Sequence, residues 1–262
     1  MPELPEVETI RRSLIPFLIG KTISEVEILS LKQFRGNKND LVGSEIKSIF
    51  RHGKVMSWQL QTNQGKEIYI SIHLKMSGSF SLKSSKHSRI AFRFSDKSSL
   101  YFNDARKFGW IKILPEPEVG GVEVLSIKLN VKYLHTKLGQ TRRSIKAVLL
   151  DQNIIAGIGN IYANDSLWEA KINPLTKANC LSTDQIETLL HMIKMIIKEG
   201  IKHKGSSKTW VYKLPDGSIG NYQNRFRVYD QEDKPCKRCG TKILRIVRNG
   251  RSSWYCPRCQ PL

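Results

Sequence analysis

Long hydrophobic runs are absent from this sequence of 262 residues. No stretch approaches the roughly 18 consecutive apolar residues that a membrane-spanning helix needs, which argues against an integral membrane protein. The N-terminus also lacks a basic segment followed by an apolar core, the pattern of a secretory signal. We therefore expect a cytoplasmic protein that no segment anchors in a membrane.

Acidic residues are scarce as well. The chain has 23 Asp and Glu against 43 Lys and Arg, a formal net charge of +20, and its isoelectric point is near 9.9. This balance predicts a polyanionic partner, which is DNA, RNA or an anionic membrane surface. We favour nucleic acid, with the protein at the nucleoid if its source is bacterial. A lysine-rich protein without any such partner is the alternative.

Cysteine is rare, with five residues in the chain. Four of them form two Cys-x2-Cys pairs on either side of residues 240–255, namely Cys236, Cys239, Cys256 and Cys259. This spacing suits four thiolates that converge on one tetrahedral zinc ion. Two disulfides are the alternative, which the reducing cytosol disfavours. Cys180 stands apart in a helical pattern, where we expect it to be a small buried apolar residue.

The hydrophobic pattern changes along the chain. Apolar residues at helical spacing predict a helix over 7–18. Alternating runs then predict the strands of an antiparallel sandwich or barrel, over 23–29, 54–60, 67–74, 89–94, 99–102 and 109–114. A segment rich in Pro and Gly follows at 115–125, and helical periodicity predicts helices over 144–152, 161–170 and 183–198. Ser182 and Gln185 form a capping box before the last helix.

The predicted fold class is therefore α+β. We expect an N-terminal antiparallel β-sandwich with a leading helix at 1–128, a helical domain with a polar loop at 129–222, and a four-cysteine zinc hairpin at 223–262. Hydrophobic residues make up 40% of the chain, which is enough for a sizeable core.

Three short motifs point to phosphate and base contacts. In Gly157-Ile158-Gly159-Asn160, the glycines permit a tight turn whose N–H groups can approach a phosphate at the start of a helix. Glycine-rich connections between helices are common, so it is the basic charge of the chain that favours phosphate binding here. The cysteine module, 236–262, contains seven Lys and Arg and no Asp or Glu. It predicts a hairpin that turns at Asn249-Gly250 and projects Arg251 toward DNA phosphate. A purely structural or protein-binding ribbon is the alternative.

The third motif is a pair of segments, 73–78 and 104–109. Each places a large side chain, Met76 or Phe108, beside small or turn-forming neighbours. Ordinary core filling at strand ends explains this pattern. The functional interpretation is a set of wedges inserted into a base stack, with Arg106 reaching into the duplex.

Taken together, these residues resemble the formamidopyrimidine-DNA glycosylase family of bifunctional base-excision enzymes. The resemblance runs through the whole chain and in the family's order. It comprises MPELPEVET at the start, Lys54 in RHGKV, HLKMSG, DARKFG, GIGNIYANDSLW and the four cysteines that end in YCPRCQ. It implies a β-sandwich followed by a helix–two-turns–helix domain and a zinc finger. It also implies damaged double-stranded DNA bound by a monomer, with the lesion nucleotide flipped out of the stack.

The resemblance also implies roles for individual residues. Pro2, once Met1 is removed, is the nucleophile; Glu3 is the acid and base around the sugar; Glu6 positions the terminal amine. Phosphates beside the lesion are held by Lys54, Asn160 and Arg251, and Tyr162 belongs to the same DNA-binding motif as Asn160. Met76, Arg106 and Phe108 fill the gap left by the flipped nucleotide. The resemblance assigns one structural zinc ion to Cys236, Cys239, Cys256 and Cys259.

The chain departs from the family pattern in places. Lys75 stands where the usual HLGMSG has glycine, and Ala105 replaces the usual proline. After Gly205, the family commonly shows a Thr-Leu-Arg/Lys-Asp-Tyr/Phe stretch that closes over oxidised guanine, whereas this chain reads SKTWVY from Ser207 to Tyr212. We therefore hypothesise that Trp210 or its neighbours alter which lesion is accepted, toward ring-opened purines, oxidised pyrimidines or abasic sites.

Two other functions compete with the enzyme. A protein of the same fold could bind damaged or structured DNA without cutting it, although such a binder would not need the set Pro2, Glu3, Glu6 and Lys54. An RNA-associated zinc-ribbon protein would account for the charge but not for the N-terminal sequence.

Overall fold

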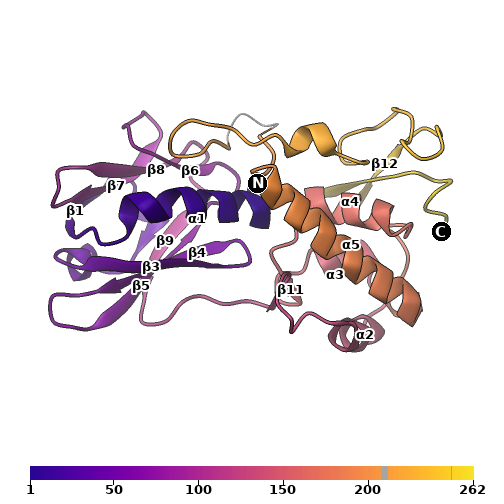
Figure 1. Ribbon diagram of the computed structural model, residues 1–262, viewed down its shortest axis with the longest axis horizontal. Helices are drawn as coiled ribbons and strands as arrows, with labels where there is room; N and C mark the ends of the chain where they lie inside the picture. Colours follow the sequence, from indigo (N-terminus) through magenta and orange to yellow (C-terminus); the bar gives the residue numbers. More distant parts are fainter. Residues whose placement is uncertain (208–211, 249) are drawn as a thin grey trace. The chain divides into compact units, whose positions relative to one another are not determined.

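A computed structural model describes residues 1–207, 212–248 and 250–262 (Figure 1). The chain forms two compact units: Met1–Val119 with His203–Asn221, and Gly120–Lys202 with Tyr222–Leu262. The three-part division at residues 128 and 222 stays a prediction. None of the helices in the described ranges is long and apolar enough to cross a membrane.

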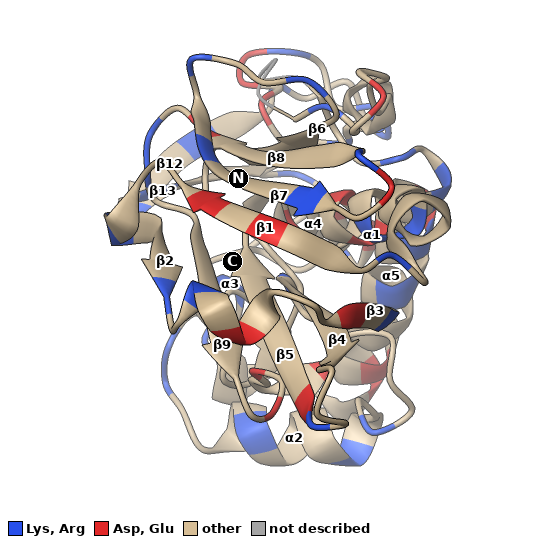
Figure 2. Ribbon diagram, turned by 90° about the vertical axis from the view of Figure 1, so that its left-hand side faces the viewer, with Lys and Arg blue, Asp and Glu red and all other residues tan. Residues whose placement is uncertain are grey.

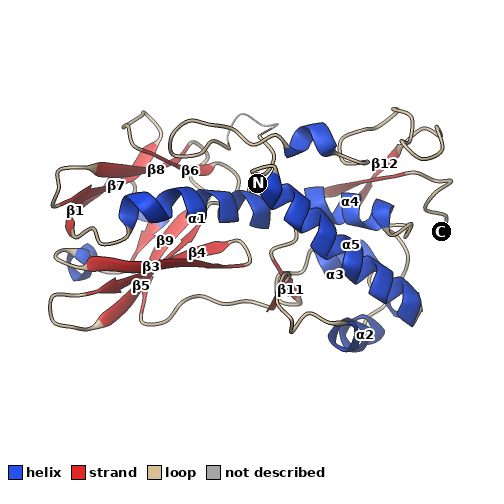
Figure 3. Ribbon diagram, viewed as in Figure 1, coloured by secondary structure: helices blue, strands red, loops and turns tan. Residues whose placement is uncertain are grey.

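The first unit contains two β-sheets (Figure 3). The four-stranded sheet is antiparallel with the order β1-β7-β8-β6, where the strands are β1 (Ile23–Ile28), β6 (Gly78–Ser81), β7 (Ser88–Phe94) and β8 (Ser99–Asp104). The five-stranded sheet has the order β2-β9-β5-β4-β3, where the strands are β2 (Phe34–Arg35), β3 (Glu45–His52), β4 (Val55–Gln61), β5 (Glu67–His73) and β9 (Trp110–Leu114). Its pairs are antiparallel except β2 with β9. Two 3-10 helices, η1 (Leu31–Gln33) and η2 (Lys38–Leu41), connect strands.

Large aromatic side chains join the two sheets. The ring of Trp58 on β4 lies 5.2 Å from that of Phe92 on β7 and 5.8 Å from that of Phe80 on β6, measured between centroids. All three side chains are buried. Because alternate residues of a strand point to opposite faces, each sheet turns one apolar face inward, and burial of these faces is the main stabilisation of the sandwich. The predicted β-sandwich is confirmed.

Helix α1 (Leu4–Leu18) covers part of the five-stranded sheet. Its apolar residues recur at helical spacing, and Val7, Ile10 and Leu14 are buried in the same core as the strands. The helix begins earlier than the predicted residue 7, because Pro5 is tolerated in a first turn.

A charged cluster holds α1 against the hairpin of β3 and β4. Glu8 accepts hydrogen bonds from Arg11 and Arg12 of its own helix, at 2.9 and 2.7 Å. It also accepts one at 3.2 Å from Nε of Arg51 on β3, whose Nη1 donates to the Gly53 carbonyl. Burial alone would raise the pKa of Glu8, but these hydrogen bonds and the nearby arginine charges lower it to about 2. The carboxylate therefore fixes the hairpin turn relative to the first turns of α1.

The second unit is mainly helical. Its helices are α2 (Val131–Gly139), α3 (Ile145–Leu149), α4 (Asn160–Glu169) and α5 (Thr183–Lys202), with 3-10 helices η3 (Ala178–Cys180) and η4 (Tyr222–Arg225). β10 (Val122–Glu123) pairs in parallel with β11 (Ile155–Ala156), and β12 (Leu244–Arg248) pairs antiparallel with β13 (Arg251–Tyr255). The predicted capping box of α5 is present, because Ser182 and Gln185 exchange side-chain-to-backbone bonds of 3.0 and 3.2 Å.

Two acids of the first unit are paired with a base on a neighbouring strand. Figure 2 shows acidic residues on β1 beside basic ones on β7. Arg93 on β7 lies 2.9 Å from Glu27 and 3.3 Å from Glu25 across this strand pair. Such exposed pairs contribute little to stability, because water and salt screen them. Their main consequence is that they neutralise acids which would otherwise repel a polyanion.

Several elements differ from the sequence predictions. The strand β3 was not predicted, because a bulge between Ile46 and Ser48 breaks its alternating pattern. Strand β6 carries one large apolar residue and was missed as well, and so was the short helix α2, whose buried Leu134 and Leu138 lie at helical spacing. The prediction that Cys180 is buried is wrong, since it lies exposed at the end of η3. The predicted hairpin is confirmed by β12 and β13, while Asn249 of its turn lies outside the described residues.

We expect Glu8→Gln to lower the free energy of unfolding by about 1–3 kcal/mol, because it removes the carboxylate that faces the nearly buried Arg51. The folded-state pKa of Glu8 lies below its ordinary 4.5, so the unfolded chain binds this proton more readily. The stabilisation is therefore present above pH 4.5 and is lost as the pH falls toward 2. Urea unfolding of both proteins at about pH 7 and about pH 3 measures the difference.

The matched control for this measurement is Arg12→Gln. Arg12 binds the same carboxylate, but its side chain is 61% exposed, so its loss is expected to cost less than about 1 kcal/mol. Equal losses in the two variants, or a Glu8 effect that persists at low pH, would contradict this account.

Candidate active site and nucleic-acid interface

The N-terminal carboxylates of the first unit form a reciprocal cap on α1. The Glu3 carboxylate accepts from the Glu6 backbone N–H, and the Glu6 carboxylate accepts from the Glu3 N–H at 2.7 Å. Glu3 and Glu6 are 3% and 2% exposed, and Pro2 is buried beside them. The structure therefore brings the three predicted catalytic residues of this stretch together at the start of one helix.

Glu6 also binds a distant segment of the same unit. Its Oε1 accepts from the Ser206 N–H at 2.8 Å. Gly205, with a φ of +73°, permits this approach, because a Cβ there would lie 2.6 Å from Oε1. One buried carboxylate thus joins the N-terminus to the beginning of the loop that departs from the family pattern.

Both ends of that loop are fixed in the first unit. Ser207 Oγ donates to the Tyr212 carbonyl at 3.0 Å and accepts from the Gly220 N–H at 2.9 Å. The Tyr212 hydroxyl donates to the Lys204 carbonyl at 3.0 Å and, more weakly, to the Glu6 carbonyl. Burial and then the Glu6 charge raise the pKa of Tyr212, so it stays a neutral donor. Residues 208–211, which include Trp210, lie outside the described residues.

Lys54 lies in the two-residue turn of the β3–β4 hairpin and is 6% exposed. Nearby, His73 at the end of β5 accepts at Nδ1 from the Lys75 N–H, which leaves its proton on Nε2. Burial, followed by the charges of Lys75, Lys54 and Lys112, lowers the pKa of His73 to about 3. At neutral pH this imidazole is uncharged and can donate from Nε2. The sequence analysis assigned it no role.

Met76 and Phe108 project from two loops of the first unit. Their side chains are 40% and 53% exposed, unlike the buried core residues that the alternative interpretation predicts. Arg106 stacks over the Phe108 ring, with its Cζ 5.0 Å from the centroid. The residues before them, Lys75 and Lys107, have φ of +50° and +56°, a conformation that costs a lysine about 1 kcal/mol.

In the second unit, the glycine motif forms the turn into α4. Gly157 has a φ of +113°, and Gln152 holds the turn by accepting from its N–H at 3.0 Å and donating to the Ile158 carbonyl at 2.8 Å. Asn160 is the first residue of α4 and is partly exposed. Tyr162 differs from the other predicted DNA-binding residues, because its side chain is wholly buried with its ring 4.9 Å from that of Tyr222.

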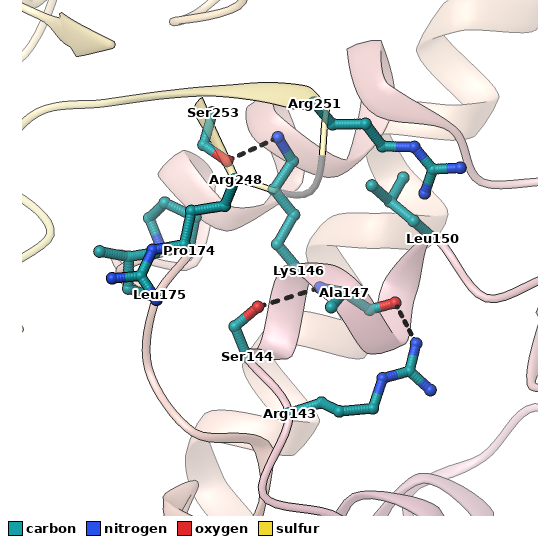
Figure 4. A pocket seen from close by; sticks show the side chains of 10 residues that line it. All are labelled: Arg143, Ser144, Lys146, Ala147, Leu150, Pro174, Leu175, Arg248, Arg251 and Ser253. Carbon is teal, nitrogen blue, oxygen red and sulfur yellow. Dashed lines mark hydrogen bonds between the residues drawn. The ribbon is translucent and has the colours of Figure 1, made fainter. Parts of the chain in front are cut away.

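Arg251, at the start of β13, borders a hollow of about 330 Å³ in the second unit (Figure 4). Two further arginines, Arg143 and Arg248, line the same hollow. Behind them the buried Lys146 donates from Nζ to the Ser252 carbonyl at 2.6 Å and to Ser253 Oγ at 2.8 Å. These bonds fix the strand directly after Arg251. The arrangement gathers cations of α3 and the hairpin around one concave surface, which suits an anion.

The four predicted metal ligands converge in the second unit. The Sγ atoms of Cys236, Cys239, Cys256 and Cys259 all lie within 4.8 Å of one another. The Cys236–Cys259 and Cys239–Cys256 pairs are 3.9 and 3.5 Å apart, close to the about 3.8 Å edge of a tetrahedral Zn–S4 site. Donor type and spacing both fit zinc.

The cysteine module is fastened to α4 by a buried acid. Asp165 is fully buried, and its carboxylate accepts from three consecutive backbone N–H groups, those of Arg227, Val228 and Tyr229. Burial raises the pKa of Asp165 to about 6, and these bonds limit the rise. Trp254 of β13 donates its backbone N–H to Asn164 at 3.0 Å. These bonds attach α4, which begins at Asn160, both to the segment that leads into the cysteine module and to the Arg251 hairpin.

Comparison with known proteins identifies the family. Residues 1–111 match the family model of the formamidopyrimidine-DNA glycosylase N-terminal domain, residues 121–211 its H2TH domain model, and residues 233–262 the zinc finger found in FPG and IleRS. The curated formamidopyrimidine-DNA glycosylase of Chloroflexus aurantiacus is 40% identical over 276 residues, covering 99% of this chain and 98% of the relative. That of Lactobacillus delbrueckii is 35% identical over 277 residues, covering 99% of each.

Solved structures agree. MutM (Fpg) of Thermus thermophilus has a TM-score of 0.91 at 33% identity, covering 99% of this chain and 98% of its own. Lactococcus lactis Fpg in complex with abasic-site DNA has a TM-score of 0.89 at 31% identity, with full coverage of both chains. This chain belongs to the formamidopyrimidine-DNA glycosylase family.

Membership confirms the resemblance, the α+β fold class and the enzyme class. A formamidopyrimidine-DNA glycosylase is a base-excision repair enzyme, and abasic-site lyase activity is characteristic of the family. The zinc-finger match and the cysteine cluster together confirm one structural zinc ion. Beyond the predicted set, the structure places Arg143 and Arg248 beside Arg251, with the buried Lys146 behind them, and an uncharged imidazole, His73, near Lys54. Only their positive or titratable character marked them in the sequence.

Zinc removal is expected to unfold the cysteine module while leaving the sandwich intact, because the cysteines share a small buried cluster with Trp168 and Trp254 of the second unit only. Hydrogen exchange after chelation should show lost protection at β12, β13 and the end of α4, with β4 and β5 unchanged. Cys239→Ser should reproduce this pattern.

Cys180→Ser is the control, since that exposed thiol lies outside the cluster. Equal loss of protection in both units would show that the finger supports the whole protein rather than its own unit.

Proposed function

We propose that this protein excises damaged bases from double-stranded DNA and cleaves the resulting abasic site through the amine of Pro2. The observation that carries the proposal is the pair of buried carboxylates, Glu3 and Glu6, that face each other across the first turn of α1 beside Pro2. Besides capping α1, a buried carboxylate beside the N-terminal amine suits proton transfer around that amine, and we assign this part to Glu3.

The chemistry follows from a secondary amine. An α-amino group has a reference pKa of about 7.7–8.0, so a useful fraction is unprotonated at neutral pH. The Pro2 nitrogen attacks C1′ of the sugar, the C1′–base bond breaks, and the base leaves with a proton. Ring opening gives an iminium, analogous to a lysine Schiff base. Its positive charge acidifies the C2′ proton, whose loss breaks the C3′–O bond by β-elimination, and δ-elimination then breaks the C5′–O bond.

The carboxylates have separate parts in this scheme. Glu3 delivers and removes protons around the sugar. Glu6 is occupied by the N–H groups of Glu3 and Ser206, so it positions the N-terminal stretch rather than exchanging protons. Since the sequence includes Met1, the reaction needs its removal to free the Pro2 amine.

DNA is held by basic and polar side chains of both units. Lys54, Asn160 and Arg251 contact phosphates beside the flipped nucleotide, and Arg143 and Arg248 extend the Arg251 surface around its hollow. Met76, Arg106 and Phe108 fill the vacated stack. For Tyr162 we propose a supporting role, because a wholly buried ring packed on Tyr222 holds the start of α4 without touching DNA itself.

The remaining assignments follow from this substrate. The protein acts as a monomer, and it acts in the cytoplasm, at the nucleoid if its source is bacterial. The relatives with solved structures include Lactococcus lactis Fpg in complexes with abasic-site DNA and with an oxidised-pyrimidine DNA.

Borohydride reduction tests the mechanism directly. The protein without Met1 should form a covalent complex with abasic duplex DNA, and the same protein with Met1 retained should lose it, because the amine is then a primary one displaced from its site. Glu3→Gln should slow base excision by about 100-fold or more. Intact-protein mass spectrometry establishes which N-terminus is present.

Arg12→Gln serves as the control, since this exposed side chain belongs to none of the proposed contacts. Binding of lesion duplex without any trapped complex by the demethionylated protein would favour the non-cleaving DNA-binding alternative. Preference for structured RNA over lesion duplex would favour the zinc-ribbon alternative.

We further propose that the segment from Ser207 to Tyr212 gives this enzyme an atypical lesion preference. Support comes from its sequence, SKTWVY, and from Glu6, which ties Ser206 to the catalytic N-terminus. Excision of ring-opened purine or oxidised pyrimidine, and cleavage of abasic sites, should exceed excision of oxidised guanine opposite C in single-turnover assays. Turnover of oxidised guanine comparable to that of the abasic duplex would refute this.

A further inference from the structure

The carboxylate of Asp104 lies where two functional loops meet. Asp104 is the last residue of β8 and is 0% exposed. Its Oδ1 accepts from Ser77 Oγ and, at 3.1 Å, from the Arg106 N–H. Its Oδ2 accepts from the Gly109 N–H at 2.7 Å and from Nε2 of Gln33 at 2.9 Å. Both oxygens are therefore occupied by donors from three separate segments of the first unit.

These donors stand next to the exposed side chains. Ser77 directly follows Met76, while the N–H groups of Arg106 and Gly109 lie on either side of Phe108. The Ser77 hydroxyl also accepts from the Arg106 N–H at 3.1 Å, so the two loops are bonded to each other as well as to Asp104.

The loops need such an anchor because their backbone is strained. Lys75 and Lys107 both adopt the left-handed conformation directly before Met76 and Phe108. A lysine relaxes out of this conformation unless surrounding bonds hold it there. The backbone of Gly109 packs tightly against Asp104 and Phe102. A Cβ at this position would lie 3.1 Å from Asp104 Oδ2 and 2.9 Å from the Phe102 ring.

Gln33 connects this anchor to η1, a part of the unit far away in sequence. Its side chain is 1% exposed, and Nε2 donates both to Asp104 and, at 3.1 Å, to the Gly109 carbonyl. The backbone of Asp104 is fixed too, because its carbonyl accepts from Nε of Arg89 and its N–H donates to the His87 carbonyl, both at 2.9 Å. The anchor is thus part of the rigid sheet, and the loops are attached to it.

We propose that Asp104 is a positioning residue that holds Met76, Arg106 and Phe108 as one preformed wedge. This inference rests on the proposed insertion of those side chains into the DNA stack. A preformed wedge avoids the entropy cost of ordering three side chains on each encounter with DNA. It also holds Arg106 in one place relative to the unpaired base of the opposite strand, so Asp104 sets how sharply that base is discriminated.

Asp104→Asn is the test, because an amide has the shape of the carboxylate but presents an NH2 group to one pair of donors. We expect the enzyme concentration for half-maximal trapping on an abasic duplex to rise about tenfold, with the maximal trapping rate changed by less than about threefold. The ratio of excision rates opposite C and opposite A should move toward one. A variant that was merely destabilised would not change this ratio.

Two further variants keep the test decisive if Asp104→Asn folds poorly. Ser77→Ala removes one hydrogen-bond donor to Asp104 and leaves the Asp104 carboxylate in place. It should change the half-maximal trapping concentration and the opposite-base ratio in the same direction as Asp104→Asn, by a smaller amount. Ser88→Ala is the matched control, since it removes a buried hydroxyl that binds Asn103 on the same sheet but contacts neither loop. Its half-maximal concentration and opposite-base ratio should equal those of the wild type.

A double-mutant comparison shows whether Asp104 acts through the wedge. In a protein that already carries Met76→Ala and Phe108→Ala, Asp104→Asn should raise the half-maximal trapping concentration much less than it does in the wild type. On a logarithmic scale, we expect less than about a third of the wild-type change. Fully additive effects, or wild-type affinity and base discrimination in Asp104→Asn, would overturn the inference. Failure of the wild type itself to trap abasic DNA would instead overturn the proposed function.

Discussion

A buried carboxylate must be supplied with hydrogen-bond donors, and this requirement sets the geometry of four functional segments among the residues that the structure describes. Glu6 gathers the N–H groups of the N-terminus and of Ser206, and Glu8 gathers arginines that fix the Lys54 hairpin. Asp104 gathers the two wedge loops, and Asp165 gathers the segment that leads into the zinc module. Each acid lies at the base of a feature that is proposed to touch DNA.

The same acids explain how so basic a chain remains folded around its functional loops. Hydrophobic burial between the sheets stabilises the sandwich as a whole, but apolar contacts have no direction and cannot fix a loop of exposed side chains. A carboxylate with several lone pairs can collect donors from segments far apart in sequence, as Asp104 does from Gln33 and Ser77. Because these acids are buried and bonded to donors of the chain itself, they do not lie on the surface that a phosphate backbone meets.

The sequence was informative wherever chemistry requires particular residues at particular spacings. The cysteine pairs and the order of motifs predicted the metal, the family and the fold class, and strong alternation predicted the central strands. Prediction failed where a local irregularity hid the pattern, as in the bulged β3, or where burial depends on neighbours from elsewhere in the chain, as for Cys180. The clustering of Arg143 with Arg248 around the Arg251 hollow likewise depends on tertiary structure, since these residues are brought together only by folding.

Unfavourable backbone conformations and buried charged groups occur mainly at the features proposed to meet DNA. Two lysines take a left-handed backbone beside exposed apolar side chains, acids are buried at the N-terminus, and an ammonium group is buried behind Arg251. Each irregularity costs free energy on its own, and each is held by hydrogen bonds to a rigid element. Side chains proposed to enter a base stack work against a stiff duplex, so a loop that moved easily would be displaced before the DNA was deformed. We therefore infer that the strained backbone of these loops is retained because it keeps the side chains that meet DNA rigid.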